Sequence, residues 1–210
     1  MSAITLFNAQ NFTQICDELA GNDTRLNTIL QRDGYPPMWT RPATFESLVW
    51  IILEQQVSLA SARAAYEQLA QKLGTITPAA LLSLSDDELR RCYFSRQKTG
   101  YVRGLAQALQ EGRLDLPGLA NMPDERVRAA LTALKGIGDW TADVYLIFCL
   151  QRANIFPIGD IALVSSMRHE WQIPAASKEE LQKIATTWQP WRSVAAMLLW
   201  HAYLERKRKK

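Results

Sequence analysis

Apolar residues recur along most of the chain at the three- and four-residue spacing of amphipathic helices. The clearest series cover residues 45–57, 62–69 and 191–202. Alternation of the kind found in strands is confined to residues 4–7, a segment too short and isolated to build a sheet. The sequence therefore predicts an all-α protein.

Capping signals mark where several of these helices begin. Ser85 with Glu88, and Ser177 with Glu180, have the spacing of the capping box, in which each side chain bonds the other's backbone amide. Pro123 is followed by two acidic residues, which are favoured at the positive end of a helix. We expect helices to start at these three places.

Residues 35–42 contain three prolines and form an extended connector, which Trp39 is expected to pack onto the body of the protein. The helices before the connector must rejoin later ones to complete a core. We expect two helical lobes with a cleft between them. Residues 1–42 would complete the C-terminal lobe, residues 43–150 would form a central domain, and residues 151–210 would form the remaining C-terminal helices.

Composition and charge narrow the class of protein. Hydrophobic residues make up 48% and charged residues 21% of the chain, as in ordinary globular proteins. The sequence has no long apolar run, and we expect no membrane span and no secretory signal. Cys16, Cys92 and Cys149 lack the spacing of a zinc or iron–sulfur site, so we expect them to be reduced thiols. The net charge of +3 depends on the five basic residues 206–210. Without them the chain has 19 basic and 21 acidic residues, a net charge of −2. Such a tail is usually solvated and frayed, and contact with a polyanion is the alternative.

The most informative segment is the turn Gly136-Ile137-Gly138, between a helix ending near Leu134 and one starting near Asp139. Glycines permit positive φ and a close approach by a neighbouring molecule. Amides at such a turn and at the following helix start bind anions, and a phosphate of a nucleic-acid backbone is a suitable one. Ile137 would turn inward and hold the two helices together. A plain helical hairpin with a glycine cap is the alternative interpretation.

A second candidate, Asp160, follows the irregular stretch 154–159 and precedes a predicted helix. Aspartate is a preferred N-cap, and capping alone would explain it. The two roles are compatible, since the amides and the dipole of the helix favour the ionised carboxylate. An ionised carboxylate at a cleft wall stabilises a cationic sugar or activates water.

Taken together, these features resemble the helix-hairpin-helix DNA glycosylase superfamily, which combines this hairpin with a Gly/Pro-rich loop and a catalytic aspartate. The similarity is closest to its 3-methyladenine DNA glycosylase II branch and extends from about residue 35 to residue 203. The matching segments are residues 52–58, 94–98, 136–142, 156–160 and 188–193.

Departures from the family pattern carry information of their own. Lys135 stands where proline is frequent, and it adds a cation beside the expected phosphate. Trp140 stands where bifunctional relatives have a lysine, so the resemblance implies a monofunctional enzyme that leaves the abasic site uncut. The iron–sulfur cysteines of the endonuclease III branch are missing. About 40 residues precede the matching core, too few for the extra N-terminal β-rich domain of the longest members.

The resemblance assigns catalysis to Asp160 and a base pocket to Trp140, Trp200 and Tyr145, with less support for Trp191. An indole face attracts a flat cation, and N-alkylation makes a purine cationic. The alternative is that these tryptophans pack the interface between lobes.

The DNA contacts are expected from two sets of residues, and Gln56 is expected to insert where the flipped nucleotide leaves the duplex. A solvated helix end and surface salt bridges are the alternatives for the second set. The first set is Lys135, Gly136, Ile137, Gly138 and Thr141 of the hairpin, and the second is Gln55, Gln56, Ser58, Arg96 and Lys98.

No cofactor is expected to be required, and no side chains form a metal site. A structural Na⁺ or K⁺ on the hairpin carbonyls is implied by the family. The expected partner is double-stranded DNA containing damaged bases, bound by a monomer in the cytoplasm or nucleoid.

The function predicted from these residues is hydrolytic excision of alkylated bases from duplex DNA. Two alternatives stay open. One is a glycosylase for a neutral lesion such as uracil, a mismatched base or an oxidised base, and the other is a non-catalytic duplex DNA-binding protein.

Overall fold

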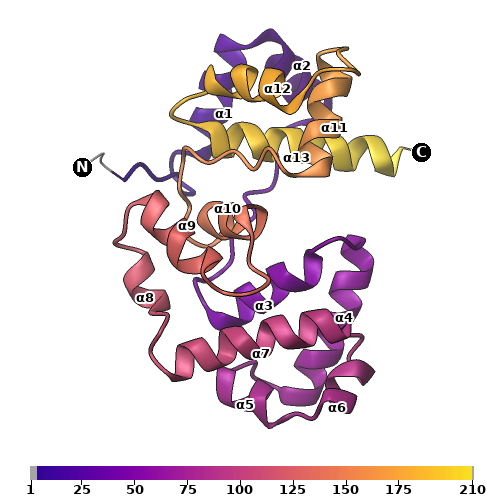
Figure 1. Cartoon of the computed structure of the whole chain (residues 1–210). Coiled ribbons are helices and arrows are strands. Elements are labelled where there is room, and N and C mark those ends of the chain that lie inside the picture. The colour runs from indigo at the N-terminus through magenta and orange to yellow at the C-terminus, as the bar shows by residue number, and fades with distance from the viewer. Residues whose placement is uncertain (1–3, 210) are drawn as a thin grey trace. The chain divides into compact units, whose positions relative to one another are not determined.

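The structure, a computed structural model, describes residues 4–209 (Figure 1). These residues contain helices and no strand, which confirms the all-α prediction. The helices are α1 (Phe12–Asn22), α2 (Thr24–Asp33), α3 (Phe45–Glu54), α4 (Leu59–Leu73), α5 (Pro78–Ser83), α6 (Asp86–Arg91), α7 (Arg96–Gln110), α8 (Leu116–Leu119), α9 (Asp124–Thr132), α10 (Asp139–Phe148), α11 (Ile161–Glu170), α12 (Lys178–Thr186) and α13 (Arg192–Arg208).

The predicted helix starts agree with the structure. Both capping boxes are formed, at Ser85 and at Ser177, and α9 begins directly after Pro123. The series predicted over residues 45–57 is shorter than expected, because α3 ends at Glu54 and Val57 is 46% exposed. The isolated segment near the N-terminus forms a single antiparallel bridge, between Leu6 and Arg152.

The chain divides into two compact units, residues 1–40 with 146–210 and residues 41–145. The predicted boundaries were 42/43 and 150/151, so the second falls beyond the end of α10, whereas the structural division falls within that helix. Residues up to 40 share the first unit with the last helices.

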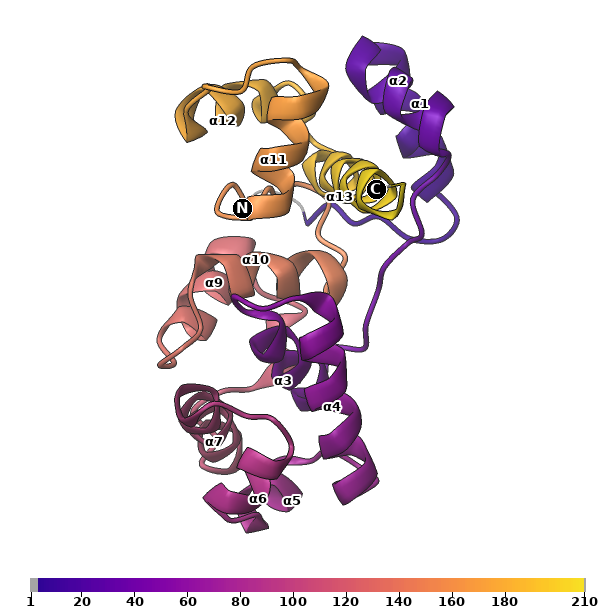
Figure 2. The same ribbon diagram turned by 90° about the vertical axis from the view of Figure 1, so that its right-hand side faces the viewer.

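In the first unit α13 is the central helix, and most of its residues from Ser193 to Ala202 are buried. The helices α1 and α2 lie on one side of it and α11 and α12 on the other (Figure 2). Trp39 packs the connector, residues 35–42, onto α13, and its ring lies 6.5 Å from that of His201.

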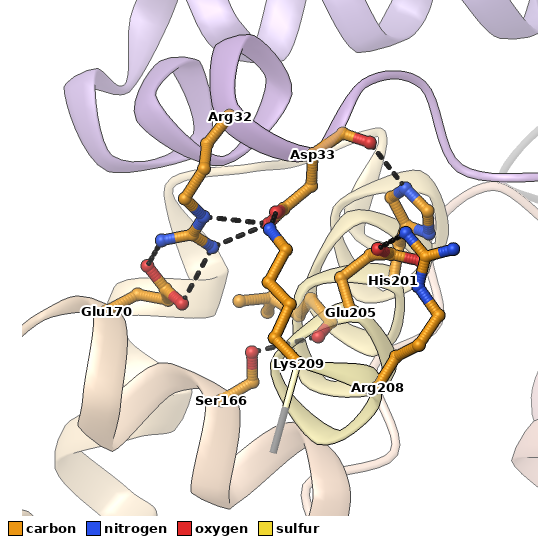
Figure 3. A network of polar contacts seen from close by, with 9 residues as sticks. Arg32, Asp33, Ser166, Glu170, His201, Glu205, Arg208 and Lys209 are labelled. Carbon is orange, nitrogen blue, oxygen red and sulfur yellow. Dashed lines mark hydrogen bonds and ion pairs between the residues drawn. The ribbon is translucent and has the colours of Figure 1, made fainter.

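The basic C-terminal run continues α13 to Arg208, so the expectation of a frayed tail is wrong for residues 206–208, although Lys207 and Arg208 are exposed to solvent. Figure 3 shows why: Asp33 at the end of α2 accepts from Arg32 and from Lys209, and Arg32 also binds Glu170 of α11. Arg208 pairs with Glu205 one turn earlier. These contacts join α2, α11 and α13, and Lys210 lies outside the described residues.

In the second unit α3 packs against α4 and α7, and α7 also contacts α5 and α6. The contact between α3 and α4 includes Trp50 stacked on Tyr66 at 4.0 Å, with Arg41 over the indole at 4.6 Å. The helices α9 and α10 follow as a hairpin, which Gln55, directly after α3, and Tyr101 of α7 contact. Among residues 4–209 no helix is long and apolar enough to cross a membrane.

Candidate functional site

The hairpin between α9 and α10 presents unpaired backbone amides. Gly136 has φ +90°, a value that glycine adopts readily, and the Ile137 amide turns back to the Leu134 carbonyl at 3.1 Å. In the described part of the chain the amides of Gly136, Gly138 and Asp139 donate to no protein acceptor. Together with the start of α10 they make a surface that favours an anion.

The hairpin is held rigid by contacts on its inner side. Ile137 is 5% exposed, as predicted for a residue that turns inward. Arg128 of α9 forms an ion pair with the buried Asp143 of α10. The ring of Tyr101 from α7 lies so close to Gly136 that a Cβ there would fall 2.1 Å from its Cγ. Glycine is therefore required at position 136 by both backbone angle and space.

Gln55 and Gln56 have different surroundings, although they are adjacent. The Gln55 side chain turns to the hairpin, where its Nε2 donates to the Gly136 carbonyl at 2.9 Å and to Thr141 Oγ1 at 2.8 Å. Gln56 is exposed and has φ +55°, uncommon for a residue with a side chain. The structure thus places Gln56 outward at the turn between α3 and α4, and gives Gln55 an intramolecular role that the sequence did not reveal.

The remaining predicted DNA contacts divide in the same way. Lys135 and Arg96 are exposed, and Ser58 is exposed while it caps α4 by accepting from the Ser61 amide at 3.1 Å. Lys98 is half-buried, and its Nζ donates to the Leu53 carbonyl at 2.6 Å. Burial lowers the pKa of Lys98. Phosphate binding by these side chains, and a cation on the hairpin carbonyls, stay predictions.

Asp160 caps α11 in the first unit, as predicted, and is 9% exposed. Its Oδ1 accepts from the Leu163 amide at 2.9 Å and from the indole Nε1 of Trp200 at 3.2 Å. These two donors fix the orientation of the carboxylate and compensate part of its desolvation. The next residue, Ile161, is 83% exposed, so the helix begins at the surface.

The loop that leads to Asp160 is fastened to the start of α13. Arg192 donates to the side chain and the carbonyl of Asn154, both at 2.7 Å. The buried hydroxyl of Ser193 bonds the Arg152 carbonyl at 2.6 Å and receives the Ile155 amide at 3.0 Å. Because α13 also carries Trp200, one helix positions both the loop and the donor to the carboxylate.

The other aromatic residues predicted for a base pocket differ in exposure. Trp200 is half-buried, with its ring 5.3 Å from that of Phe148. Trp140 is half-buried in the first turn of α10, whereas Tyr145 is completely buried. Trp191 donates to Glu18 at 3.2 Å and stands at the start of α13. A role in base binding for Trp140, Trp200 and Tyr145 stays a prediction.

Comparison with known proteins decides the family. Residues 49–190, more than half of the chain, match the family described as HhH-GPD superfamily base excision DNA repair protein. This chain belongs to that superfamily. The resemblance noted in the sequence is thereby confirmed, and the matched HhH-GPD region includes the hairpin and Asp160.

Individual relatives agree with this assignment. A DNA-3-methyladenine glycosylase of Bacillus subtilis (strain 168) is 29% identical over 174 residues, which are 76% of this chain and 57% of the relative. A DNA-3-methyladenine glycosidase structure from Bacillus halodurans has a TM-score of 0.75 and 29% identity, covering 99% of this chain and 95% of that one. The Schizosaccharomyces pombe 3-methyladenine DNA glycosylase Mag1 in complex with abasic DNA has a TM-score of 0.82 at 24% identity, covering 89% and 95%. The chain spans 57% of the length of this B. subtilis relative and 66% of a second one, the putative DNA-3-methyladenine glycosylase YfjP of the same strain.

Two supporting contacts of the HhH-GPD hairpin were missed by sequence reasoning. Tyr101 is 35 residues from Gly136, and Gln55 is 81 residues from the same glycine. Neither residue has a pattern that points to the hairpin, because both contacts depend on how α3 and α7 pack.

Proposed function

We propose that this protein is a monofunctional DNA glycosylase that excises alkylated, 3-methyladenine-type bases from duplex DNA in base excision repair. The observation that carries the proposal is Asp160, a carboxylate oriented by a backbone amide and an indole N–H within an HhH-GPD chain. The relatives named as DNA-3-methyladenine glycosylases support the choice of lesion, and the Mag1 complex supports DNA as the partner.

The hairpin grips the DNA backbone in this proposal. The amides of Gly136, Gly138 and Asp139 bind a phosphate without reading sequence, and Lys135 adds a nearby positive charge. The damaged nucleotide rotates out of the stack, at a cost of a few kcal/mol that is smaller for a weakened base pair. Gln56, exposed at its turn, fills the space that the nucleotide leaves.

Chemistry follows at the sugar. Alkylation has made the base a good leaving group, so the C1′–N bond breaks and the base departs with the bonding electron pair. Asp160 stabilises the positive charge that develops on the deoxyribose, as carboxylates do in glycosidases. Water adds to C1′ and loses a proton, which leaves an abasic site. An indole face attracts the cationic base before it leaves, and Trp140 and Trp200 are the residues expected to supply one.

The product is an uncut strand, because Trp140 occupies the position where bifunctional relatives carry a lysine. No cofactor takes part in these steps, and a monovalent cation at the hairpin would have a structural role only. We propose that the enzyme acts as a monomer in the compartment that holds the DNA.

A panel of duplexes tests the proposal. Each duplex carries one lesion, either 3-methyladenine or 7-methylguanine, or a neutral one such as uracil or 8-oxoguanine, and released bases are separated by chromatography. The proposal predicts release of the alkylated bases. Release of a neutral base alone would establish a different glycosylase. Salt-dependent duplex binding without release of any base would indicate a non-catalytic binder.

A further inference from the structure

The side chain of Gln55 connects the two parts of the second unit that the proposed function places on DNA. Its Nε2 donates both to the carbonyl of Gly136 and to the hydroxyl of Thr141. Thr141 is 1% exposed and Gln55 is half-buried, so these bonds are partly shielded from solvent. One amide group thus joins the end of α3 to both sides of the hairpin turn.

The next residue along the chain is the exposed one. Gln56 follows Gln55 directly, so their Cα atoms are about 3.8 Å apart. Its φ of +55° holds it in a left-handed conformation that a side chain adopts at some cost in free energy. Such a conformation persists where neighbouring contacts fix the backbone, and the two bonds made by Gln55 do so on one side.

A second contact fixes the same helix end from α7. Lys98 Nζ donates to the carbonyl of Leu53, in the last turn of α3. A cation at this position interacts favourably with the negative end of the helix. Tyr101, one turn further along α7, packs against Gly136. The helix α7 therefore supports the end of α3 and the hairpin together.

We propose that Gln55 is a positioning residue that keeps the exposed Gln56 in a fixed register with the phosphate-binding hairpin. This inference rests on the proposed function, and it assigns Gln55 to neither phosphate nor base. When the hairpin binds the DNA backbone, the two hydrogen bonds of Gln55 already place Gln56 beside the base stack. Prearranged groups of this kind lower the entropic cost of reaching the reactive geometry.

The inference predicts that a change at Gln55 impairs base eversion and leaves affinity for the duplex unchanged. The hairpin keeps its other supports, the Arg128–Asp143 ion pair and Tyr101, when Gln55 is changed. Gln55→Met keeps the length of the side chain and removes its donor. We expect the single-turnover excision rate of a 3-methyladenine duplex to fall about tenfold. Affinity for an undamaged duplex should change by less than about twofold.

The matched control is Gln68→Met, because Gln68 is an exposed glutamine of α4 in the same unit. It should leave both quantities unchanged. Base eversion is followed directly by the fluorescence of 2-aminopurine placed next to an abasic site in the duplex. This signal should fall with Gln55→Met and stay at the wild-type level with Gln68→Met.

A purely structural role predicts another result. In that case Gln55→Met would lower the melting temperature and reduce excision and duplex affinity by the same factor, which would overturn the inference. Unchanged excision and eversion would overturn it as well.

Failure of the proposed function has a separate signature. If wild type releases no base from any duplex, the proposed function is wrong, and the 2-aminopurine signal still decides whether Gln55 couples the two elements. If wild type releases base and the two glutamine variants behave alike, the positioning inference alone is wrong.

Discussion

The hairpin of the second unit and the Asp160 site of the first unit differ in the groups that they present, which are backbone amides in the hairpin and a side-chain carboxylate at Asp160. The hairpin offers backbone amides, and two side chains from outside the hairpin, Gln55 and Tyr101, support it. The Asp160 site offers a side chain, which a backbone amide and the indole of Trp200 hold in place. A surface of backbone amides binds phosphate without regard to sequence, whereas a single oriented carboxylate acts on one atom. The difference suggests that binding and chemistry can be damaged separately.

The largest expected effect is at the carboxylate. Asp160→Asn removes the negative charge, while its amide oxygen still accepts from Leu163 and Trp200. We expect single-turnover excision to fall by about 1,000-fold, with affinity for an abasic-site duplex within about twofold of wild type. Gel-shift titration beside the rate measurement checks both. An equal loss of binding and excision would show that Asp160 is only a helix cap.

Next in size is a change in the hairpin. Gly136→Ala would force a Cβ into the ring of Tyr101 at a φ that alanine rarely adopts. We expect duplex affinity to fall by about 100-fold, together with the melting temperature. Gly138→Ala is the control for folding, because a Cβ there meets nothing within 4 Å. Wild-type affinity in Gly136→Ala would contradict the assigned role of the turn.

A substitution at Trp200 distinguishes the effect of aromatic stacking from that of the hydrogen bond to Asp160. Trp200→Phe keeps an aromatic ring beside Phe148 and removes the donor to Asp160. We expect kcat to fall about tenfold with KM nearly unchanged, since the lost bond orients the carboxylate rather than the DNA. Steady-state kinetics on a lesion duplex measure both constants. A rise in KM with constant kcat would indicate that the indole acts mainly in stacking.

The smallest effect concerns the ion pairs that Asp33 forms at the end of α2. Burial raises the pKa of Asp33, but the bonds and charges of Arg32 and Lys209 outweigh burial and hold the pKa below its ordinary value. Its contribution to stability is therefore present above the unfolded pKa of about 3.9 and is lost as the pH falls through the folded value. Asp33→Asn should cost about 1 kcal/mol at pH 7, or about 3 °C in melting temperature.

Melting curves at pH 7 and below pH 3 check this sign. The difference between wild type and Asp33→Asn should vanish in acid. Asp87→Asn is the control, because Asp87 is an exposed carboxylate 3.9 Å from Arg90 and should change little at either pH. A constant difference across the pH range would contradict the role given to Asp33, and excision at pH 7 should be unaffected by either change.

Much of this molecule could be predicted from local patterns. Helix starts at Ser85, Pro123 and Ser177, the inward turn of Ile137 and the capping position of Asp160 all follow from short-range rules, and all are confirmed. The early end of α3 could not be predicted, because the apolar period continues through Val57 while the backbone leaves the helix at Gln55.

Long-range contacts explain the other differences. The basic tail reads as a frayed end until α2 places Asp33 beside Lys209, 176 residues away. Lys98, which is expected to contact phosphate, also donates to the Leu53 carbonyl at the end of α3, a contact that the sequence does not indicate. In both cases a charged side chain has a partner that only tertiary packing provides, and nothing in the local sequence distinguishes it from a solvated one.

The most direct test of the account uses wild type and one defined duplex that contains a single 3-methyladenine. Free base and strand length are followed together in a single turnover. The account predicts that 3-methyladenine appears in solution while the strand stays intact until alkali is added. Tight binding of the duplex with no free base, or strand cleavage at the same rate as base release, would contradict it.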